Sequence, residues 1–308
     1  MNETPKPKIG FALGSGASRG WSHIGVLEAL LREGIEPDII CGTSVGAMVG
    51  GSYAAGNLDA LKSWVLSSTR SDVFKFFDIK PTKTGFVDLA TFRNFLHSYV
   101  AAEQVCIEDL ARPFVAVATD LDTGREVWLK EGGLAHAARA SMAMPGLFPA
   151  VRDNNRWLVD GGLVNPVPVS VCRALGADVV IGVNLKSDIV GKWRKKADAV
   201  REQEDSGVLR NIKKQAREYS TNLFAGNGDK ESPPGLFYAI PSAINIFQDR
   251  ITRSRLVGDP ADVLITPRVG DIGILEFQRA EEAMQKGVEA VEAASDEIHR
   301  AIKMGIHA

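Results

Sequence analysis

The stretch Gly42-Thr43-Ser44-Val45-Gly46 follows a short apolar run, residues 39–41, and opens a run of small residues that ends at Ala55. A strand, a sharp turn carrying a serine and then a helix is the layout of a nucleophile elbow. Gly42 and Gly46 flank Ser44 where a side chain would collide with the strand or the helix. The following helix directs its positive N-terminus at the serine. The motif predicts a nucleophilic serine, and an ordinary turn with a capping serine is the alternative.

Strands and helices alternate around this motif. We expect strands at residues 8–13, 35–41, 113–121, 125–130, 156–160, 178–185 and 262–265 from their apolar or alternating patterns. Helices are expected at residues 21–32, 45–55, 135–144, 169–175, 241–256 and 275–302. A chain that opens with a β-α-β-α order favours an α/β fold with a mostly parallel, covered sheet.

The sequence becomes more highly charged after the strand predicted at residues 178–185. A motif-bearing core at about 8–185 is followed by a charged insertion at about 186–240 and a helical part at about 241–308. The last part holds too little strand to form its own core, so residues 1–308 are expected to form one domain. The insertion fits a solvated helix and flexible loop, or a surface that meets anionic lipid headgroups.

Composition narrows the class of protein. The 308 residues are 45% hydrophobic and 24% charged, which is ordinary for a globular chain. A net charge of -2 argues against a nucleic-acid binder. The chain has no apolar run of the roughly 18 residues that span a membrane, no signal-peptide pattern and only three separated cysteines. We therefore expect a cytoplasmic protein, with peripheral contact to a membrane left open, and its oligomeric state is undetermined.

A serine needs a base, and histidine is scarce here. The candidates downstream of Ser44 are His97, His136, His299 and His307, which lie in helical patterns or in the tail. None sits beside a glycine-rich turn, so a Ser-His triad is disfavoured. The sequence also has no His/Cys/Asp cluster at metal-ligand spacing, and neither a metal nor a cofactor is expected.

Asp160 is the best candidate for the base. It ends an apolar strand and is followed by Gly161 and Gly162, which leave the carboxylate clear at the edge where α/β sheets bind ligands. A carboxylate that contacts a serine directly can accept its proton. Asp120 also ends a strand, but the residues after it indicate a hairpin turn. A turn-forming Asp160 without chemistry is the alternative.

The loop Gly14-Ser15-Gly16-Ala17-Ser18-Arg19-Gly20 lies between the first strand and the first helix. Small residues let backbone amides approach a substrate, and such donors lower the barrier for an oxyanion by about 3 kcal/mol. Arg19 adds a positive charge to this loop, and Val45 offers a further N–H. A dinucleotide-binding turn is the rival interpretation, disfavoured because Arg19 breaks the G-x-G-x-x-G spacing and the second strand ends without an acidic residue.

Together these residues resemble the patatin-like phospholipase family. The match is closest to its bacterial RssA-like branch, which is related to the neuropathy target esterase catalytic domain. The glycine-rich loop ending in Arg19-Gly20, the G-x-S-x-G motif at 42–46 and the run Asp160-Gly161-Gly162 occur in the family's order, and the similarity extends over roughly residues 8–270. The resemblance implies a three-layer α/β/α sandwich and hydrolysis of lipid acyl esters. It also implies Ser44 as nucleophile, Asp160 as base and the loop from Gly14 to Gly20 as oxyanion hole.

One departure concerns the family's three consecutive glycines, which fall on Ser15-Gly16-Ala17. Both substitutes keep their N–H, but their side chains restrict φ values that glycine permits. A weakly active or non-catalytic regulatory protein on the same fold is therefore the alternative function.

Overall fold

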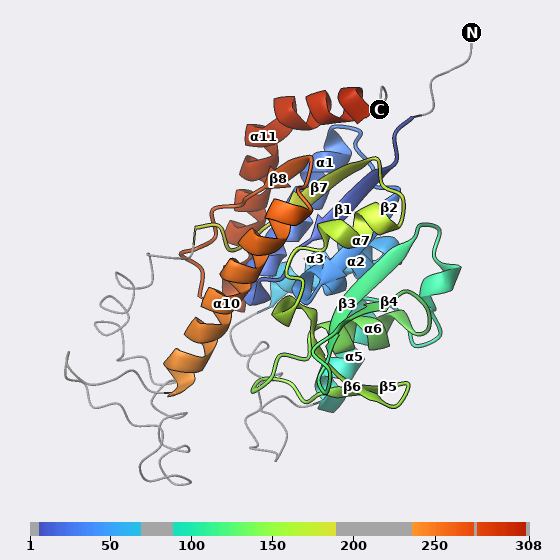
Figure 1. Ribbon diagram of the computed structural model, residues 1–308, viewed down its shortest axis with the longest axis vertical. Coiled ribbons are helices and arrows are strands. Elements are labelled where there is room, and N and C mark those ends of the chain that lie inside the picture. The colour runs from blue at the N-terminus through green and yellow to red at the C-terminus, as the bar shows by residue number, and fades with distance from the viewer. Residues whose placement is uncertain (1–5, 69–88, 189–235, 274–275, 306–308) are drawn as a thin grey trace, which may run out of the picture.

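The computed structural model describes residues 6–68, 89–188, 236–273 and 276–305 (Figure 1). Most of the charged insertion predicted at 186–240, and His307, lie outside these residues.

An eight-stranded sheet forms the middle layer, in the order β5-β6-β3-β2-β1-β7-β8 with β4 paired to β3. Neighbouring strands are parallel from β3 to β8, and antiparallel where β4, β5 and β6 extend the β3 edge. The parallel strands are β1 (Ile9–Leu13), β2 (Ile39–Thr43), β3 (Phe114–Asp120), β7 (Val179–Val183) and β8 (Val263–Ile265). The antiparallel ones are β4 (Glu126–Leu129), β5 (Val151–Asp153) and β6 (Arg156–Asp160).

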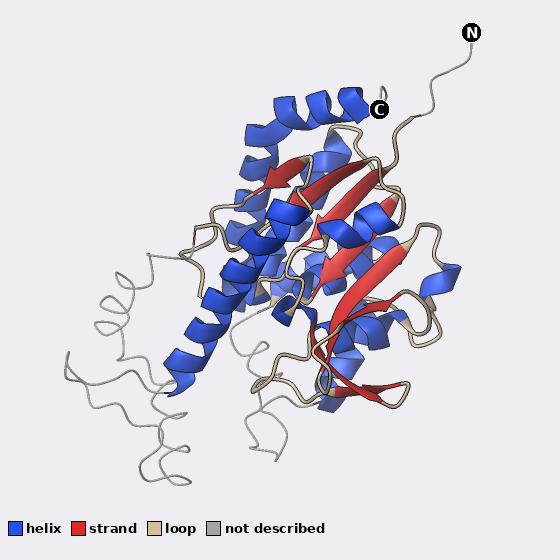
Figure 2. Ribbon diagram, in the orientation of Figure 1, coloured by secondary structure: helices blue, strands red, loops and turns tan. Residues whose placement is uncertain are grey.

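Helices cover both faces of this sheet (Figure 2). On one face lie α7 (Val169–Ala174) and α10 (Leu236–Gly258). The other face packs against α1 (Ser22–Arg32), α2 (Val45–Ala54), α3 (Leu58–Ser67), α5 (Leu89–Tyr99), α6 (Leu134–Ser141) and α11 (Ala280–Gly305). Strands β1, β2, β3 and β7 are buried along their whole length, as expected of parallel strands covered on both sides. The predicted α/β/α sandwich with a mostly parallel sheet is confirmed.

Some boundaries differ from the prediction. The second strand begins at Ile39 rather than at residue 35, since Pro37 has no N–H for a sheet ladder. Strand β5 was not anticipated, because three residues carry too little pattern to be recognised. Short 3-10 helices also occur, at η1 (Ala17–Trp21), η2 (Ile107–Asp109), η3 (Gly161–Leu163) and η4 (Phe277–Arg279).

The C-terminal helix α11 lies directly on the first helix α1 (Figure 1). A Cβ added at Gly25 of α1 would overlap the Met284 carbonyl oxygen, and one added at Gly287 of α11 would overlap the Ser22 carbonyl oxygen. The two backbones therefore touch, and a glycine on each helix is what permits the contact. This packing joins the last segment of the chain to the first.

We expect Gly25→Ala to lower the free energy of unfolding by about 1–3 kcal/mol, because the added methyl forces α1 and α11 apart. Thermal or denaturant unfolding measures the change. Gly258→Ala is the matched control, since an added Cβ there meets nothing within 4 Å. Equal stability of the two variants would contradict the close contact.

Candidate active site

Ser44 stands in the turn between β2 and α2 in a rarely populated backbone conformation, with φ 57° and ψ -125°. Its N–H donates to Ser141 Oγ at 2.8 Å, and the Ser141 hydroxyl donates to the Val117 carbonyl at 2.6 Å. Ser141 thus ties the strained turn to β3. The surrounding structure holds the Ser44 backbone in a conformation that an isolated chain would rarely adopt.

The glycines around Ser44 make room for neighbouring backbone. A Cβ at Gly42 would lie 2.5 Å from Cα of Ala47, and one at Gly46 would overlap the Leu13 carbonyl oxygen at the end of β1. Gly161 is equally constrained, because a Cβ there would overlap the Val117 carbonyl oxygen. These positions require glycine for close approach, as the sequence pattern indicated.

The structure brings Ser44 and Asp160 together although 116 positions separate them. Ser44 Oγ donates to Asp160 Oδ2 at 2.6 Å, and the Gly162 N–H donates to the other carboxylate oxygen, Oδ1, at 2.7 Å. The Asp160 backbone is fixed as well, because its carbonyl accepts from Thr119 Oγ1 at 2.9 Å and its N–H donates to the Ala143 carbonyl at 3.0 Å. The hydroxyl and carboxylate are both buried, with Ser44 8% and Asp160 1% exposed.

Burial governs the electrostatics of this pair. Burial raises the pKa of Asp160 to about 6, while the Ser44 hydroxyl, the Gly162 N–H and the charge of Lys186 each oppose the rise. The result is a carboxylate that is more basic than a free aspartate yet still ionised at neutral pH. Such a group suits proton transfer, since the best catalytic pKa lies near the working pH. Lys186 was not singled out from the sequence, although it follows a strongly apolar strand directly.

Three amides of the glycine loop already have hydrogen-bond acceptors. The N–H of Gly14 donates to the Val183 carbonyl at 3.1 Å, that of Ser15 to the Pro166 carbonyl at 2.9 Å, and that of Arg19 to Gly16 at 3.2 Å. These amides are therefore occupied. The N–H groups of Gly16, Ala17 and Val45 have no acceptor among the residues that the structure describes. These three N–H groups are therefore free to donate a hydrogen bond to a bound molecule.

Gly20 of the glycine loop and Gly162 after Asp160 have packing roles. A Cβ at Gly20 would overlap the Val45 side chain, so the end of the loop rests on the residue after Ser44. Gly162 is crowded by Gln248 Nε2, which would lie 2.5 Å from its added Cβ, and by Ser15 Oγ at 3.1 Å. Helix α10 and the glycine loop thus both approach the Asp160 turn.

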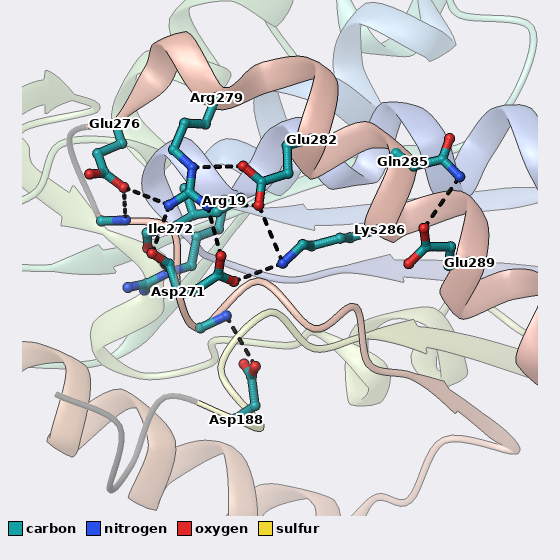
Figure 3. A network of polar contacts seen from close by, with 12 residues as sticks. Arg19, Asp188, Asp271, Ile272, Glu276, Arg279, Glu282, Gln285, Lys286 and Glu289 are labelled. Atoms are coloured by element: carbon teal, nitrogen blue, oxygen red, sulfur yellow. Dashed lines mark hydrogen bonds and ion pairs between the residues drawn. The ribbon is translucent and has the colours of Figure 1, made fainter. Parts of the chain in front are cut away.

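Arg19 anchors the loop to the C-terminal part of the chain. Its side chain is 1% exposed, and its Nε donates to the Ile272 carbonyl at 2.8 Å. Burial lowers its pKa to about 10, with Asp188, Glu276 and Asp271 opposing the shift, so the guanidinium stays charged at neutral pH. Figure 3 shows Arg19 beside the cluster in which Asp271 binds Arg279 and Lys286, at 2.7 and 2.8 Å. Ser18 adds a 2.6 Å hydrogen bond to the Gly273 carbonyl.

The rival acid Asp120 and the histidines considered as bases lie elsewhere, and His97 is in the last turn of α5. Asp120 Oδ1 accepts the N–H groups of Asp122 and Thr123, both at 3.0 Å, so this carboxylate stabilises the predicted hairpin turn. His136 and His299 face Asp153 and Glu33. In the described ranges, no histidine is hydrogen-bonded to Ser44 or Asp160. Asp160 is the carboxylate that contacts Ser44, and its role as the base stays a prediction.

The family model "Patatin-like phospholipase" matches residues 11–173, which include the glycine loop, Ser44 and Asp160. The chain belongs to the patatin-like phospholipase family. It is 31% identical to the uncharacterized NTE family protein Rv1063c of Mycobacterium tuberculosis over 94% of each chain. It is also 33% identical to human patatin-like phospholipase domain-containing protein 6, over 58% of this chain and 13% of that protein.

Family membership supports lipid acyl hydrolase activity in general and confirms the NTE-related resemblance. The matched range ends before Lys186 and before α10, so the family model does not include these parts of the site. Within the described residues, no helix is long and apolar enough to cross the membrane, and no three His, Cys, Asp or Glu side chains cluster as metal ligands.

A cavity of about 210 Å³ lies beside α6 and the β5–β6 hairpin of this patatin-like protein. It is lined by Arg139, Phe148, Pro149, Ala150, Val151, Arg152 and Trp157. Neither Ser44 nor Asp160 lines it, so this cavity is separate from the hydroxyl–carboxylate pair.

The departure at Ala17 has a measurable consequence. Ala17 adopts φ 52°, a left-handed conformation that costs a residue with a side chain about 1–2 kcal/mol. We expect Ala17→Gly to raise the free energy of unfolding by about 0.5–1 kcal/mol, because relief of strain exceeds the added entropy of the unfolded chain. The measurement is chemical denaturation of the purified variant.

Ala293→Gly, on the exposed side of α11, is the control for this experiment. It should destabilise the protein by about 1 kcal/mol through helix propensity alone. A destabilised Ala17→Gly variant would show that the loop does not strain residue 17.

Proposed function

We propose that this protein is a serine acyl hydrolase that cleaves fatty-acyl esters of lipids, with Ser44 as nucleophile and Asp160 as general base. The observation that carries the proposal is the buried 2.6 Å hydrogen bond from Ser44 Oγ to Asp160 Oδ2. Membership of the patatin-like phospholipase family supports the lipid ester as substrate.

The proposed reaction proceeds in two halves. Asp160 accepts the Ser44 proton as Ser44 Oγ attacks the acyl carbonyl carbon, and the resulting oxyanion receives hydrogen bonds from the free amides of Gly16, Ala17 and Val45. The tetrahedral intermediate collapses to an acyl-serine, and Asp160 returns the proton to the departing alcohol. Asp160 then accepts a proton from water as that water attacks the acyl-serine, and it returns this proton to Ser44 Oγ as the fatty acid leaves.

Burial explains how a carboxylate can take the place of a histidine. A solvent-exposed aspartate is a weak base, whereas burial brings the pKa of Asp160 to about 6, close to that of a free imidazole. The Gly162 N–H holds Oδ1 and leaves Oδ2 to the serine. The proposed mechanism therefore needs no histidine between the acid and the serine.

A non-catalytic regulatory protein on the same fold is the second candidate. The side chains of Ser15 and Ala17, where the family has glycine, favour it, because the Ser15 N–H is already occupied by Pro166. Nucleotide binding has no comparable support, since the second strand ends in Thr43, whose hydroxyl donates to the Asn165 carbonyl at 2.8 Å.

The test of the enzyme proposal uses a fluorophosphonate probe and a p-nitrophenyl ester. We expect the probe to label the wild type but not Ser44→Ala. Asp160→Asn should lower ester turnover by about a hundredfold or more, because it removes the general base. Asp120→Asn is the matched control and should keep its activity, since that carboxylate only holds a turn.

Absence of both labelling and ester turnover in the wild type would favour the regulatory alternative. Normal turnover by a folded Asp160→Asn variant would mean that another residue is the base.

We also propose that α10 contacts a lipid surface. Its Ile246 and Phe247 are 53% and 64% exposed, and exposed Arg250 follows them, a combination that suits an anionic membrane surface. On the buried side of the same helix, Gln248 lies against Gly162, which donates to Asp160. Contact through α10 would therefore bring the lipid close to the proposed nucleophile. A cytoplasmic location stays a prediction.

We expect Phe247→Asp to reduce co-sedimentation with phosphatidylglycerol-containing vesicles by about fivefold or more, because a buried phenyl group contributes about 2 kcal/mol. Met304→Asp, which alters an exposed apolar side chain on α11, should bind as the wild type does. Equal binding by both variants and the wild type would exclude α10 as the contact surface.

A further inference from the structure

Lys186 is buried at the edge of the sheet where the proposed active site lies. It follows β7, the strand that pairs with β1, and β1 leads into the glycine loop. The preceding residue, Leu185, packs against that loop, since its Cδ1 would lie 2.7 Å from a Cβ added at Gly16. The Lys186 N–H donates to Asn184 Oδ1 at 3.0 Å, which fixes the turn, and its side chain is only 3% exposed.

Among the residues that the structure describes, the ammonium group of Lys186 has no hydrogen-bond or ion-pair partner, although the residue is only 3% exposed. Lysine is seldom this buried without a paired acid. Contacts place this lysine on the Asp160 side of the glycine loop. Leu185, the residue before it, packs on Gly16, while Ser15 Oγ would lie 3.1 Å from a Cβ added at Gly162. Gly162 in turn donates to Asp160.

The charged groups that act on Lys186 are Asp160 at the end of β6, Arg19 in η1 and Asp249 on α10. Asp249 is itself bound to Arg253 at 2.9 Å. The acid left without a paired cation is Asp160.

Asp160 makes its hydrogen bonds without Lys186. Both carboxylate oxygens already accept a hydrogen bond, Oδ2 from Ser44 and Oδ1 from the Gly162 N–H. A lysine bonded to Oδ2 would compete with the serine and would make the carboxylate too weak a base. A cation within electrostatic range, but not in contact, stabilises the charge and leaves Oδ2 to the serine.

We propose that Lys186 is a positioning residue for the reaction, whose buried charge keeps the Asp160 carboxylate ionised and ready to accept the Ser44 proton. The inference rests on the proposed Ser44–Asp160 mechanism. Burial of Asp160 favours its neutral form, which cannot act as a base, and Lys186 counteracts that effect at neutral pH. Arg19 is less suited to this role because its guanidinium faces Asp188, Glu276 and Asp271.

The two titrations are linked. Burial raises the pKa of Asp160 to about 6 and lowers that of Lys186 to about 7, and each group's charge opposes the other's shift. Loss of the Lys186 charge therefore raises the pKa of Asp160 further. The fraction of enzyme with an ionised base then falls at pH 6 to 7 and recovers at higher pH.

The experiment is the pH profile of kcat/KM on a soluble ester, for the wild type and for Lys186→Met, Lys186→Gln and Lys186→Arg. We expect the acid limb of the wild type near pH 6 and a shift of about one pH unit upward in the two neutral variants. Activity should then fall several-fold at pH 6 and much less at pH 8.5. Lys186→Arg should keep its acid limb near that of the wild type.

Lys62→Met serves as control, because Lys62 pairs with Glu28 on the surface of α3 and α1. Its acid limb should coincide with that of the wild type. The proposal would be overturned if a folded Lys186→Met or Lys186→Gln variant kept the acid limb of the wild type. It would also be overturned if kcat/KM fell by the same factor at every pH, because that is the effect expected of a purely structural lysine.

A second measurement needs neither a Lys186 variant nor catalysis. In wild type labelled with ¹³C at the aspartate carboxyl carbon, the Asp160 resonance, assigned by its loss in Asp160→Asn, should titrate in two steps. One step belongs to Asp160 and the other, at higher pH, to Lys186. A single step would overturn the coupling. An inactive, unlabelled wild type that still shows two steps would refute the proposed function and leave the coupling intact.

Discussion

The structure depends on one constraint, the close passage of backbone past backbone at the turn that carries Ser44. Strand β1 runs so near this turn that any side chain at Gly46 would overlap it. Ser44 is held at a positive φ by the hydrogen bond from its N–H to Ser141. A strained residue persists only where the surroundings determine its conformation, and here β1, β2, β3 and α6 all contribute. The serine hydroxyl is thereby directed at Asp160 rather than at solvent.

The same burial that restrains Ser44 determines the character of the acid beside it. An aspartate in water would be too weak a base for a serine, and one in a wholly apolar pocket would be protonated. Asp160 lies between these limits because two hydrogen bonds and a nearby cation offset part of the cost of burying its charge. The proposed chemistry thus depends on a balance of desolvation and charge, contributed by β6, the Asp160 turn and the residue after β7.

Segments remote in sequence complete this site. The C-terminal helix α11 packs on α1 through glycine contacts. The carbonyl groups of Gly273 and Ile272 accept hydrogen bonds from Ser18 and Arg19 of the glycine loop. Helix α10 adds Gln248 beside Gly162. A loop rich in small residues has little rigidity of its own, so these contacts are what hold its free amides near the elbow.

The amino-acid sequence by itself determined the fold class, the family and the pairing of Ser44 with Asp160 as the residues to examine. These rest on local patterns: apolar runs, glycines at fixed offsets from a serine, and an aspartate before two glycines. The tertiary structure alone decided which loop amides remain free, that Arg19 is anchored to Ile272, and that Lys186 is buried beside the glycine loop. Hydrogen-bond partners and desolvation arise from segments a hundred or more residues apart, and no local pattern records which of them will meet.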